Sequence, residues 1–509
     1  MRSARREKEI VFFFLLAWFA GNLFFLTRFP LVHSDESWLA GLTRNMMESG
    51  SMGVTEPFFD LKPRYPHAIK ILFHLLQMPF LLAFGYSAFS VRLLSLLFGA
   101  ASLYLVFRIS REMASFHISL AVTVLVSLDG QFLTAAHTAR QEILLFCALL
   151  LLILVFLKGK GEVTARRAAL LACITGLCVG LHPNSFLLAV GCGAAMVFLM
   201  LSRRRFVIKP LLVYIGVTGA FAACFVGISF LFDSQFPAHY SVYGDTEFGL
   251  AVPFAEKFRE FLPYLQRLWL GVSGTYVLPK LQAHFLLFPA LTVWAAIRAV
   301  RGKDGKLLVS LGMILGAVLG TVLIGRYNQL SAALWMLPCF LLLPPLLSRV
   351  PLRKAALIAL TAVFAVSSAL SFAPALAYSY EDYLLQISAY AAPGEKTLAN
   401  LNAGFYFENG ALLDIRNLSY LKENDLSFAD YVKTRGIKVI LWPEEMDFIY
   451  SRRPDFNAVY GNPRYVEEVE EYLKTDCTYL GEFENGGYAV RIVQELGKPY
   501  KVRAYRVNP

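Results

Sequence analysis

The chain has 509 residues, of which 57% are hydrophobic and only 17% are charged. A mean hydropathy of +0.52 excludes the several soluble domains that this length would otherwise predict, and it excludes secreted, fibrous and disordered proteins. The net charge of +11 does not indicate a nucleic-acid partner, because the basic residues of a membrane protein gather in its cytoplasmic loops. We therefore expect a polytopic α-helical membrane protein.

The chain begins with a basic segment followed by an apolar run at residues 10–26. No small-residue cleavage site follows this run and further apolar runs come later, so we expect a retained signal anchor with a cytoplasmic N-terminus. Basic clusters separate the later runs, and each one predicts a cytoplasmic loop. The clusters comprise residues 2–8, 108 and 111, 158–167, 203–209, 298–306 and 349–354. Their alternation with connections poor in basic residues predicts about eleven transmembrane helices.

The first outer loop is predicted at about residues 28–86. Its apolar stretch at residues 67–84 should be a juxtamembrane or re-entrant helix, because a full span there would place the next basic clusters outside. Arg64 and His67 come just ahead of this helix on the predicted outer side. These two residues are therefore candidate ligands for a substrate at the membrane surface.

The most informative segment of this loop is the acidic stretch that begins at residue 33. Ser34 is a good N-cap, Asp35 and Glu36 fall in the first turn, and an apolar stripe ends at Gly50, which predicts an amphipathic helix on the membrane. The two carboxylates could simply complement the helix dipole. Adjacent helical positions diverge by about 100°, so they cannot share one proton and should have separate roles. One could take a proton from an acceptor hydroxyl while the other binds a cation or fixes the loop.

Further polar residues interrupt the apolar pattern at the later outer connections. They are Arg140 with Glu142, His182, and Arg326 with Tyr327. Each could serve only as a turn residue or an interfacial anchor. All of them fall on the predicted outer side, whereas the span interiors are nearly free of charge. A transporter or lipid flippase, the main alternative, would place such residues near the bilayer midplane, so the pattern favours chemistry at the surface.

Two later segments also leave the membrane on the outer side. The loop at about residues 233–280 is polar and aromatic, with an amphipathic helix predicted near residues 254–268. From residue 375 the composition becomes charged and rich in turns, which predicts a separate extracytoplasmic α/β domain at residues 375–509. Strands are predicted at residues 438–442 and in a hairpin of residues 479–483 and 488–493, and a helix at residues 465–473. The seven cysteines show no disulfide or zinc spacing.

These motifs together resemble a known superfamily. His33-Ser-Asp-Glu, Lys62-Pro-Arg-Tyr-Pro, Arg92-Leu-Leu-Ser-Leu-Leu, the segment 136–142, and Arg326-Tyr327 with Pro338 look like the GT-C superfamily of integral membrane glycosyltransferases. Within it, the chain resembles the protein mannosyltransferase and lipid A aminoarabinose transferase branch. The resemblance implies a GT-C-like catalytic module at residues 1–374. Two positions depart from the pattern: Glu142 stands where many relatives have Asp, and His182 stands where a basic residue is usual.

The resemblance implies a hexosyl- or pentosyltransferase that moves a sugar, with inversion, from a polyprenyl-phosphate donor to a lipid, glycan or protein acceptor outside the bacterial inner membrane. A membrane polymerase or ligase of surface polysaccharide would share this chemistry. A phosphate leaves without protonation, so one carboxylate base and a cationic cradle suffice. Asp35 is then the base, and Glu36 and Glu142 are orienting carboxylates, or metal ligands if a divalent ion is used. The candidate substrate-binding residues are Arg64, His67, Arg140, Glu142, His182, Arg326 and Tyr327.

Overall fold

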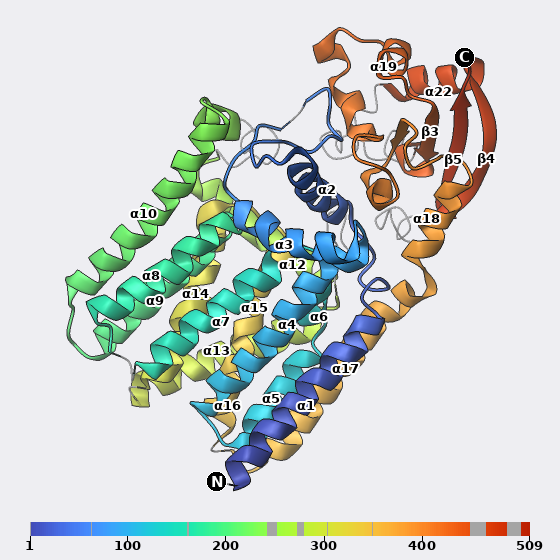
Figure 1. Ribbon diagram of the computed structural model, residues 1–509. Helices are drawn as coiled ribbons and strands as arrows, with labels where there is room; N and C mark the ends of the chain where they lie inside the picture. Colours follow the sequence, from blue (N-terminus) through green and yellow to red (C-terminus); the bar gives the residue numbers. More distant parts are fainter. Residues whose placement is uncertain are drawn as a thin grey trace.

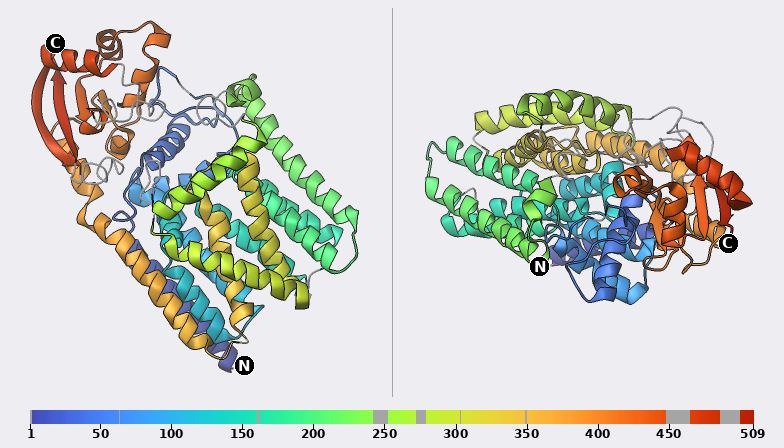
Figure 2. Two further views of the ribbon diagram at one scale, coloured as in Figure 1. Left: turned by 180° about the vertical axis from the view of Figure 1, so that it is seen from behind. Right: turned by 90° about the horizontal axis from the view of Figure 1, so that it is seen from above.

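The computed structural model describes residues 2–62, 64–159, 162–241, 252–271, 279–302, 304–348, 350–447, 465–485 and 500–509. A large helical bundle and a smaller α/β domain occupy opposite ends of the molecule (Figure 1). The N-terminus lies at the end of the bundle far from the α/β domain, and α17 leads from that end back to the domain (Figures 1 and 2). We call the two ends of the bundle the N-terminal end and the domain end.

The larger unit is built from apolar helices joined by short connections. They are α1 (Arg2–Phe24), α2 (Ser34–Ser49), α3 (Ile71–Phe84), α4 (Ala88–Arg111), α5 (Phe116–Ser127), α6 (Gly130–His137), α7 (Glu142–Lys158), α8 (Ala165–Leu177), α9 (Ser185–Ser202), α10 (Ile208–Phe232), α12 (Phe254–Leu270), α13 (Gln282–Gly302), α14 (Gly305–Ile324), α15 (Ala333–Met336), α16 (Leu343–Leu347) and α17 (Arg353–Phe372). The predicted amphipathic helix near residues 254–268 is therefore present as α12.

Within the described residues, seven helical stretches are long and apolar enough to cross a membrane. They are Ala88–Arg111, Ser185–Ser202, Ile208–Phe232, Gln282–Gly302, Gly305–Ile324, Leu330–Leu347 and Arg353–Ser388. The pair α5 and α6, bent by 64°, would make an eighth. The chain is thus a multi-pass membrane protein by length and composition, but the predicted number of eleven spans is not confirmed. Two neighbouring helices are short, since α7 has 17 residues and α8 has 13.

The basic clusters meet at the N-terminal end of the bundle. The Lys158 ammonium at the end of α7 pairs with the Glu112 carboxylate after α4, and the Lys306 ammonium of α14 donates to the Glu112 carbonyl. Arg111 also pairs with Glu7 at the start of α1, at 3.4 Å. Loops that are far apart in the sequence therefore lie at the same end of the bundle, as the alternation of basic clusters predicts.

The first loop differs from its prediction at the start of α2. The N-cap is His33 rather than Ser34, because the His33 side chain accepts a hydrogen bond from the α2 backbone. The helix ends, as expected, at Gly50 with a φ of 65°. It sits between the bundle and the α/β domain (Figure 1). The next helix, α3, has 14 residues and is about 21 Å long, which is short of the ~30 Å hydrocarbon core.

The bend between α5 and α6 brings charge into the bundle, where the sequence predicted almost none. Asp129 caps α6 by accepting from the Phe132 backbone N–H at 2.8 Å, and its other oxygen pairs with the buried His284 ring of α13 at 2.6 Å. Two backbone carbonyls at the bend are also paired, since Trp18 donates to Ser127 at 3.1 Å and Ser368 donates to Leu128 at 2.6 Å. In a membrane each such group must find a partner inside the protein, and this bend is hydrogen-bonded to three other helices, α1, α13 and α17.

The α/β domain contains a mixed sheet with the strand order β2-β1-β3-β5-β4. Its strands are β1 (Thr397–Ala399), β2 (Leu412–Asp414), β3 (Val439–Pro443), β4 (Cys477–Asn485) and β5 (Tyr500–Val507), and its helices are α18 (Tyr380–Ser388), α19 (Phe428–Arg435) and α22 (Val466–Thr475). The predicted strand at residues 438–442 and helix at 465–473 are confirmed as β3 and α22. The first strand of the predicted hairpin is part of β4, which pairs antiparallel with β5; the second, residues 488–493, lies outside the described residues.

Candidate active site

The start of α2 is held by reciprocal hydrogen bonds. The His33 ring Nδ1 accepts from the Asp35 backbone N–H at 3.0 Å, and the Glu36 carboxylate accepts from the His33 backbone N–H at 2.9 Å. Burial lowers the pKa of His33 to about 4, so its ring is neutral and Nδ1 keeps the lone pair that this bond needs. This capping box fixes the direction in which the first turn of α2 presents its side chains.

Glu36 is fully buried in an ion pair with Arg92 of α4. The Arg92 guanidinium donates two bonds of 2.7 Å to the Glu36 carboxylate, and both side chains are 0% exposed. The Ala139 backbone N–H adds a third bond at 2.8 Å, and Arg92 also donates to the Leu26 carbonyl at 2.9 Å. Glu36 therefore joins α2 to α4 and to the loop after α6, and Arg92 extends these contacts to the segment after α1.

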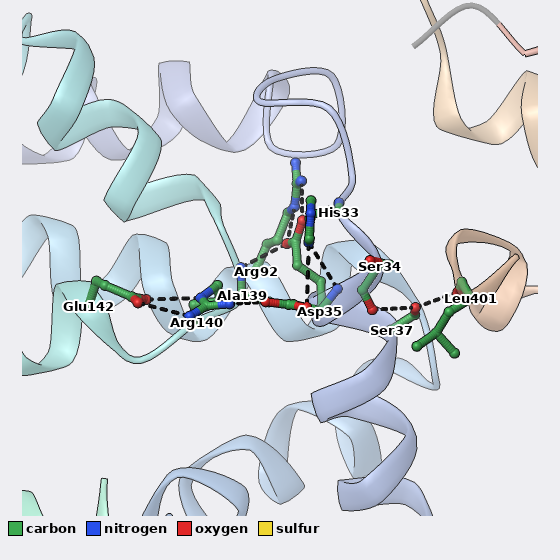
Figure 3. Close-up of polar contacts among 10 residues, drawn as sticks. His33, Ser34, Asp35, Ser37, Arg92, Ala139, Arg140, Glu142 and Leu401 are labelled. Carbon is green, nitrogen blue, oxygen red and sulfur yellow. Dashed lines mark hydrogen bonds and ion pairs between the residues drawn. The ribbon is translucent and has the colours of Figure 1, made fainter. Parts of the chain in front are cut away.

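Asp35 points away from this buried pair and towards Arg140 (Figure 3). Its carboxylate forms an ion pair with the Arg140 guanidinium. Arg140 also donates from Nε and Nη2 to the Glu142 carboxylate, at 3.2 and 3.1 Å. The Asp35 side chain is 26% exposed, whereas that of Glu142 is 3% exposed. Of the three predicted carboxylates, Asp35 is thus the one that a substrate can reach.

A cavity of about 210 Å³ opens beside Asp35 at the domain end of the bundle. Its charged lining consists of Asp35, Glu56, Arg64, Lys70, Arg140, Arg326 and Arg416. Five cations and two acids give the lining an excess of positive charge, which suits an anionic ligand. Of the residues singled out in the sequence, six line the cavity: Asp35, Arg64, His67, Arg140, His182 and Arg326. Glu36, Glu142 and Tyr327 do not line it; Tyr327 instead donates to the Lys257 carbonyl and packs on Tyr264.

Lys70 also lines the cavity, although the sequence patterns assign it no role. It is the N-cap of α3 and has a φ of 98°, an uncommon backbone conformation for a side chain of this size. Burial, and then the charges of Arg326 and Arg64, lower the pKa of its ammonium to about 7. Within the described part of the chain no carboxylate forms an ion pair with it. An anion bound beside Lys70 would therefore stabilise the charged form of its side chain.

The histidines of the cavity are neutral. Burial and the nearby Lys70 charge lower the pKa of His67 to about 3 and that of His182 well below its usual value. The His182 Nδ1 accepts from the Asn184 backbone N–H at 3.0 Å, so its single ring proton lies on Nε2. These rings can therefore hydrogen-bond a substrate but do not add positive charge at neutral pH.

The carboxylates predicted as metal ligands do not fit that role as they are arranged. Glu36 is held in a bidentate pair with Arg92, and Glu142 in one with Arg140. Among the residues that the structure describes, no group of three His, Cys, Asp or Glu side chains is placed to hold a metal ion.

Comparisons by sequence find no matching family model and no matching curated protein. Comparison of the fold finds ArnT from Cupriavidus metallidurans bound to undecaprenyl phosphate, at 14% identity and a TM-score of 0.55, covering 97% of each chain. It also finds the oligosaccharyltransferase of Archaeoglobus fulgidus in complex with zinc and sulfate, at 15% identity and a TM-score of 0.52, covering 93% of this chain and 72% of that one. A second structure of that archaeal enzyme, AglB with an inhibitory peptide and a dolichol-phosphate, matches at 14% identity and a TM-score of 0.51, covering 92% of this chain and 72% of that one.

These likenesses span nearly the whole chain and include both the bundle and the α/β domain. At such low identity they show a shared fold and nothing finer. The chain therefore shares the fold of the ArnT and oligosaccharyltransferase structures.

Proposed function

We propose that the protein is an inverting glycosyltransferase that moves a sugar from a polyprenyl-phosphate donor to an acceptor on the extracytoplasmic side of the membrane. One observation carries the proposal: an accessible carboxylate, Asp35, faces a cavity lined by Lys70, Arg140 and Arg326 at the domain end of the bundle. A base beside a cationic cradle is what transfer from a lipid-linked phosphate requires.

The cationic residues would bind the phosphate of the donor. A sugar phosphodiester carries one negative charge, and the polyprenyl phosphate that leaves carries nearly two. Lys70 and Arg326 would therefore interact more strongly with the leaving group than with the donor, which lowers the barrier to departure. The proposal draws support from the ArnT and archaeal structures, which hold undecaprenyl phosphate and a dolichol-phosphate.

Asp35 would accept the proton of the acceptor group as it attacks the sugar. Its pairing with Arg140 orients the carboxylate, and Glu142 in turn holds Arg140 by two bonds. Glu36 does not reach the cavity, so we assign it a positioning role: it fixes the first turn of α2 from which Asp35 projects. The predicted catalytic pair is thereby divided into one base and one structural carboxylate.

A transport function has one specific observation in its favour, the buried Asp129–His284 pair at the bend between α5 and α6. Broken helices with ionisable residues are typical of transporter sites. Here, however, the Asp129 carboxylate is used to cap α6 and to bind His284, and neither residue lines the charged cavity. The pair is better explained as the anchor of the bend.

A transfer assay with purified full-length protein tests the proposal. The donor is the pool of polyprenyl-phosphate sugars extracted from cells grown with a radioactive sugar, and the acceptor is a preparation of membrane vesicles from cells lacking the protein. We expect protein-dependent movement of label to a new product, with inhibition by added undecaprenyl phosphate. A folded protein that neither binds undecaprenyl phosphate nor moves label would rule the function out.

A further inference from the structure

A second carboxylate, that of Glu56 in the first outer loop, lines the cavity, and the sequence patterns assign it no role. Its side chain is only 3% exposed. Oε1 accepts a hydrogen bond from the Trp38 indole N–H at 2.5 Å and lies 3.8 Å from Nε of Arg64. Within the described part of the chain, Oε2 has no hydrogen-bond partner, and it is not sealed inside the protein. This oxygen therefore opens into the cavity, where a ligand with a hydrogen-bond donor would satisfy it.

The Glu56 carboxylate is held in place before a ligand binds. The Asn45 side chain of α2 donates to the Thr55 carbonyl at 2.6 Å, which fixes the backbone next to Glu56. The Trp38 indole then fixes the carboxylate itself. An acceptor oriented in this way loses little conformational entropy when it binds a ligand.

The geometry of α2 places Glu56 close to the proposed base. Trp38 comes three positions after Asp35 in this helix, so the two side chains are neighbours on one helix face, and both line the cavity. Because Glu56 is bonded to the Trp38 ring, its carboxylate belongs to the same wall of the cavity as that of Asp35.

The group that must lie beside the base, whatever the acceptor is, is the transferred sugar. Its anomeric carbon is the atom that the acceptor attacks, from a distance of about 3–3.5 Å. Sugar hydroxyl groups are hydrogen-bond donors, and a carboxylate is a strong acceptor for them. In glycosidases, a hydrogen bond to the hydroxyl beside the anomeric carbon strengthens as positive charge develops on the ring, and the same charge develops during transfer.

We propose that Oε2 of Glu56 accepts a hydrogen bond from a hydroxyl group of the transferred sugar. This bond holds the sugar between the base and the phosphate site, and it becomes stronger in the transition state. The inference rests on the proposed transferase function and adds a sugar-binding residue to it.

The test compares Glu56→Gln with Asp60→Asn in the transfer assay described above. Each variant exchanges one carboxylate of the first loop for its amide, but Asp60 pairs with Arg435 of the α/β domain and does not line the cavity. The amide oxygen of Glu56→Gln can still accept from the Trp38 indole.

For Glu56→Gln we expect the ratio of turnover to the donor concentration at half-maximal rate to fall about 10-fold to 100-fold. The affinity for undecaprenyl phosphate, which carries no sugar, should not weaken. Asp60→Asn should change neither quantity. Glu56→Asp keeps the carboxylate but withdraws it by one methylene, and it should show a smaller loss; it replaces the Gln variant if that variant does not fold.

Four outcomes would overturn the inference. Near-normal transfer by Glu56→Gln would show that the residue does not bind the reacting sugar, and an equal loss in Asp60→Asn would trace the effect to the structure of the loop. Weaker binding of undecaprenyl phosphate by Glu56→Gln would show a disturbed phosphate site, and a change only in the amount of vesicles needed for half-maximal rate would place the residue on the acceptor. An active wild-type protein leaves the transferase function intact in each case, whereas a folded wild-type protein that neither moves label nor binds undecaprenyl phosphate refutes the function itself.

Discussion

At the scale of single residues, two adjacent carboxylates have opposite surroundings. Asp35 is partly exposed beside a cavity, and Glu36 is sealed against Arg92. Their divergence follows from the helix, since neighbouring positions point about 100° apart. The same turn can therefore supply a reactive group and its anchor.

Replacing each carboxylate by its amide should separate these roles. Asp35→Asn should lower turnover about 100-fold to 10,000-fold, as the loss of a positioned base does, and leave thermal stability nearly unchanged. Glu36→Gln leaves the Arg92 charge buried without its counterion, which should cost about 3–5 kcal/mol of stability. Thermal unfolding and turnover, measured on equal amounts of folded protein, check both. Full activity of Asp35→Asn would exclude Asp35 as the base.

Lys70 should make donor binding depend on pH. Its pKa of about 7 means that the ammonium is largely neutral above that pH, whereas a bound phosphate favours the charged form and raises the pKa. Binding then takes up a proton, so the affinity for undecaprenyl phosphate should fall as the pH rises from 7.5 to 9.5, by at most about 10-fold per unit. The phosphate itself, with a second pKa of about 6, is already fully ionised in this range.

Lys70→Arg is the control for this pH dependence, because its charge does not titrate. Binding measured by titration calorimetry should be nearly independent of pH in this variant. If the wild-type protein and the variant lose affinity in parallel, another group is responsible.

Six of the cavity residues were predictable because they are polar side chains near the ends of apolar runs. Asp35, Arg140 and Arg326 were all found in this way. Lys70 was not assigned because its role depends on a positive φ at the start of α3. Arg416 was not found because no pattern in a sequence reveals which surface of a separate domain will dock on the first loop.

At the scale of helices, α9 and α14 approach each other closely through glycine. A Cβ atom added at Gly312 would lie 2.4 Å from the Ala195 Cα, and one at Gly316 would lie 2.5 Å from the Gly191 Cα. These contacts involve backbone atoms, so the helices would have to separate. Small residues spaced four apart are the usual means of such packing in membranes.

Gly312→Ala should therefore destabilise the protein by about 1–3 kcal/mol, the usual cost of overpacking. Gly193 on α9 has nothing within 4 Å of an added Cβ, and Gly193→Ala should be neutral or slightly stabilising because Ala is the better helix former. Thermal unfolding in one detergent compares the two. Equal stability of both variants would contradict the close approach of these helices.

At the scale of the whole molecule, the division into a helical bundle and an α/β domain follows from composition and could be predicted. The number of spans could not be confirmed, because several helices bend or stop short. The bend at Asp129 divides one apolar stretch into α5 and α6, and α7, with 17 residues, is shorter than the usual span of about 20. Such breaks are stabilised by contacts with other helices. A hydropathy profile contains no information about those contacts.

The orientation can be tested with two exposed positions at opposite ends of the molecule. In a background without native cysteines, Glu423→Cys in the α/β domain should react with a membrane-impermeant thiol reagent added to intact cells. Glu162→Cys, between α7 and α8, should react only after the cells are permeabilised. The reverse pattern would invert the topology and place the cavity in the cytoplasm.

The cavity lining runs from Asp35 near one end of the chain to Arg416 in the α/β domain, and this has a consequence for biogenesis. During synthesis the bundle helices enter the membrane long before residue 416 leaves the ribosome. Even when every span is inserted, the wall formed by the domain is missing until that late segment has been synthesised and folded. A nascent chain should thus carry an incomplete site throughout insertion, and its activity would begin only with the arrival of its final domain.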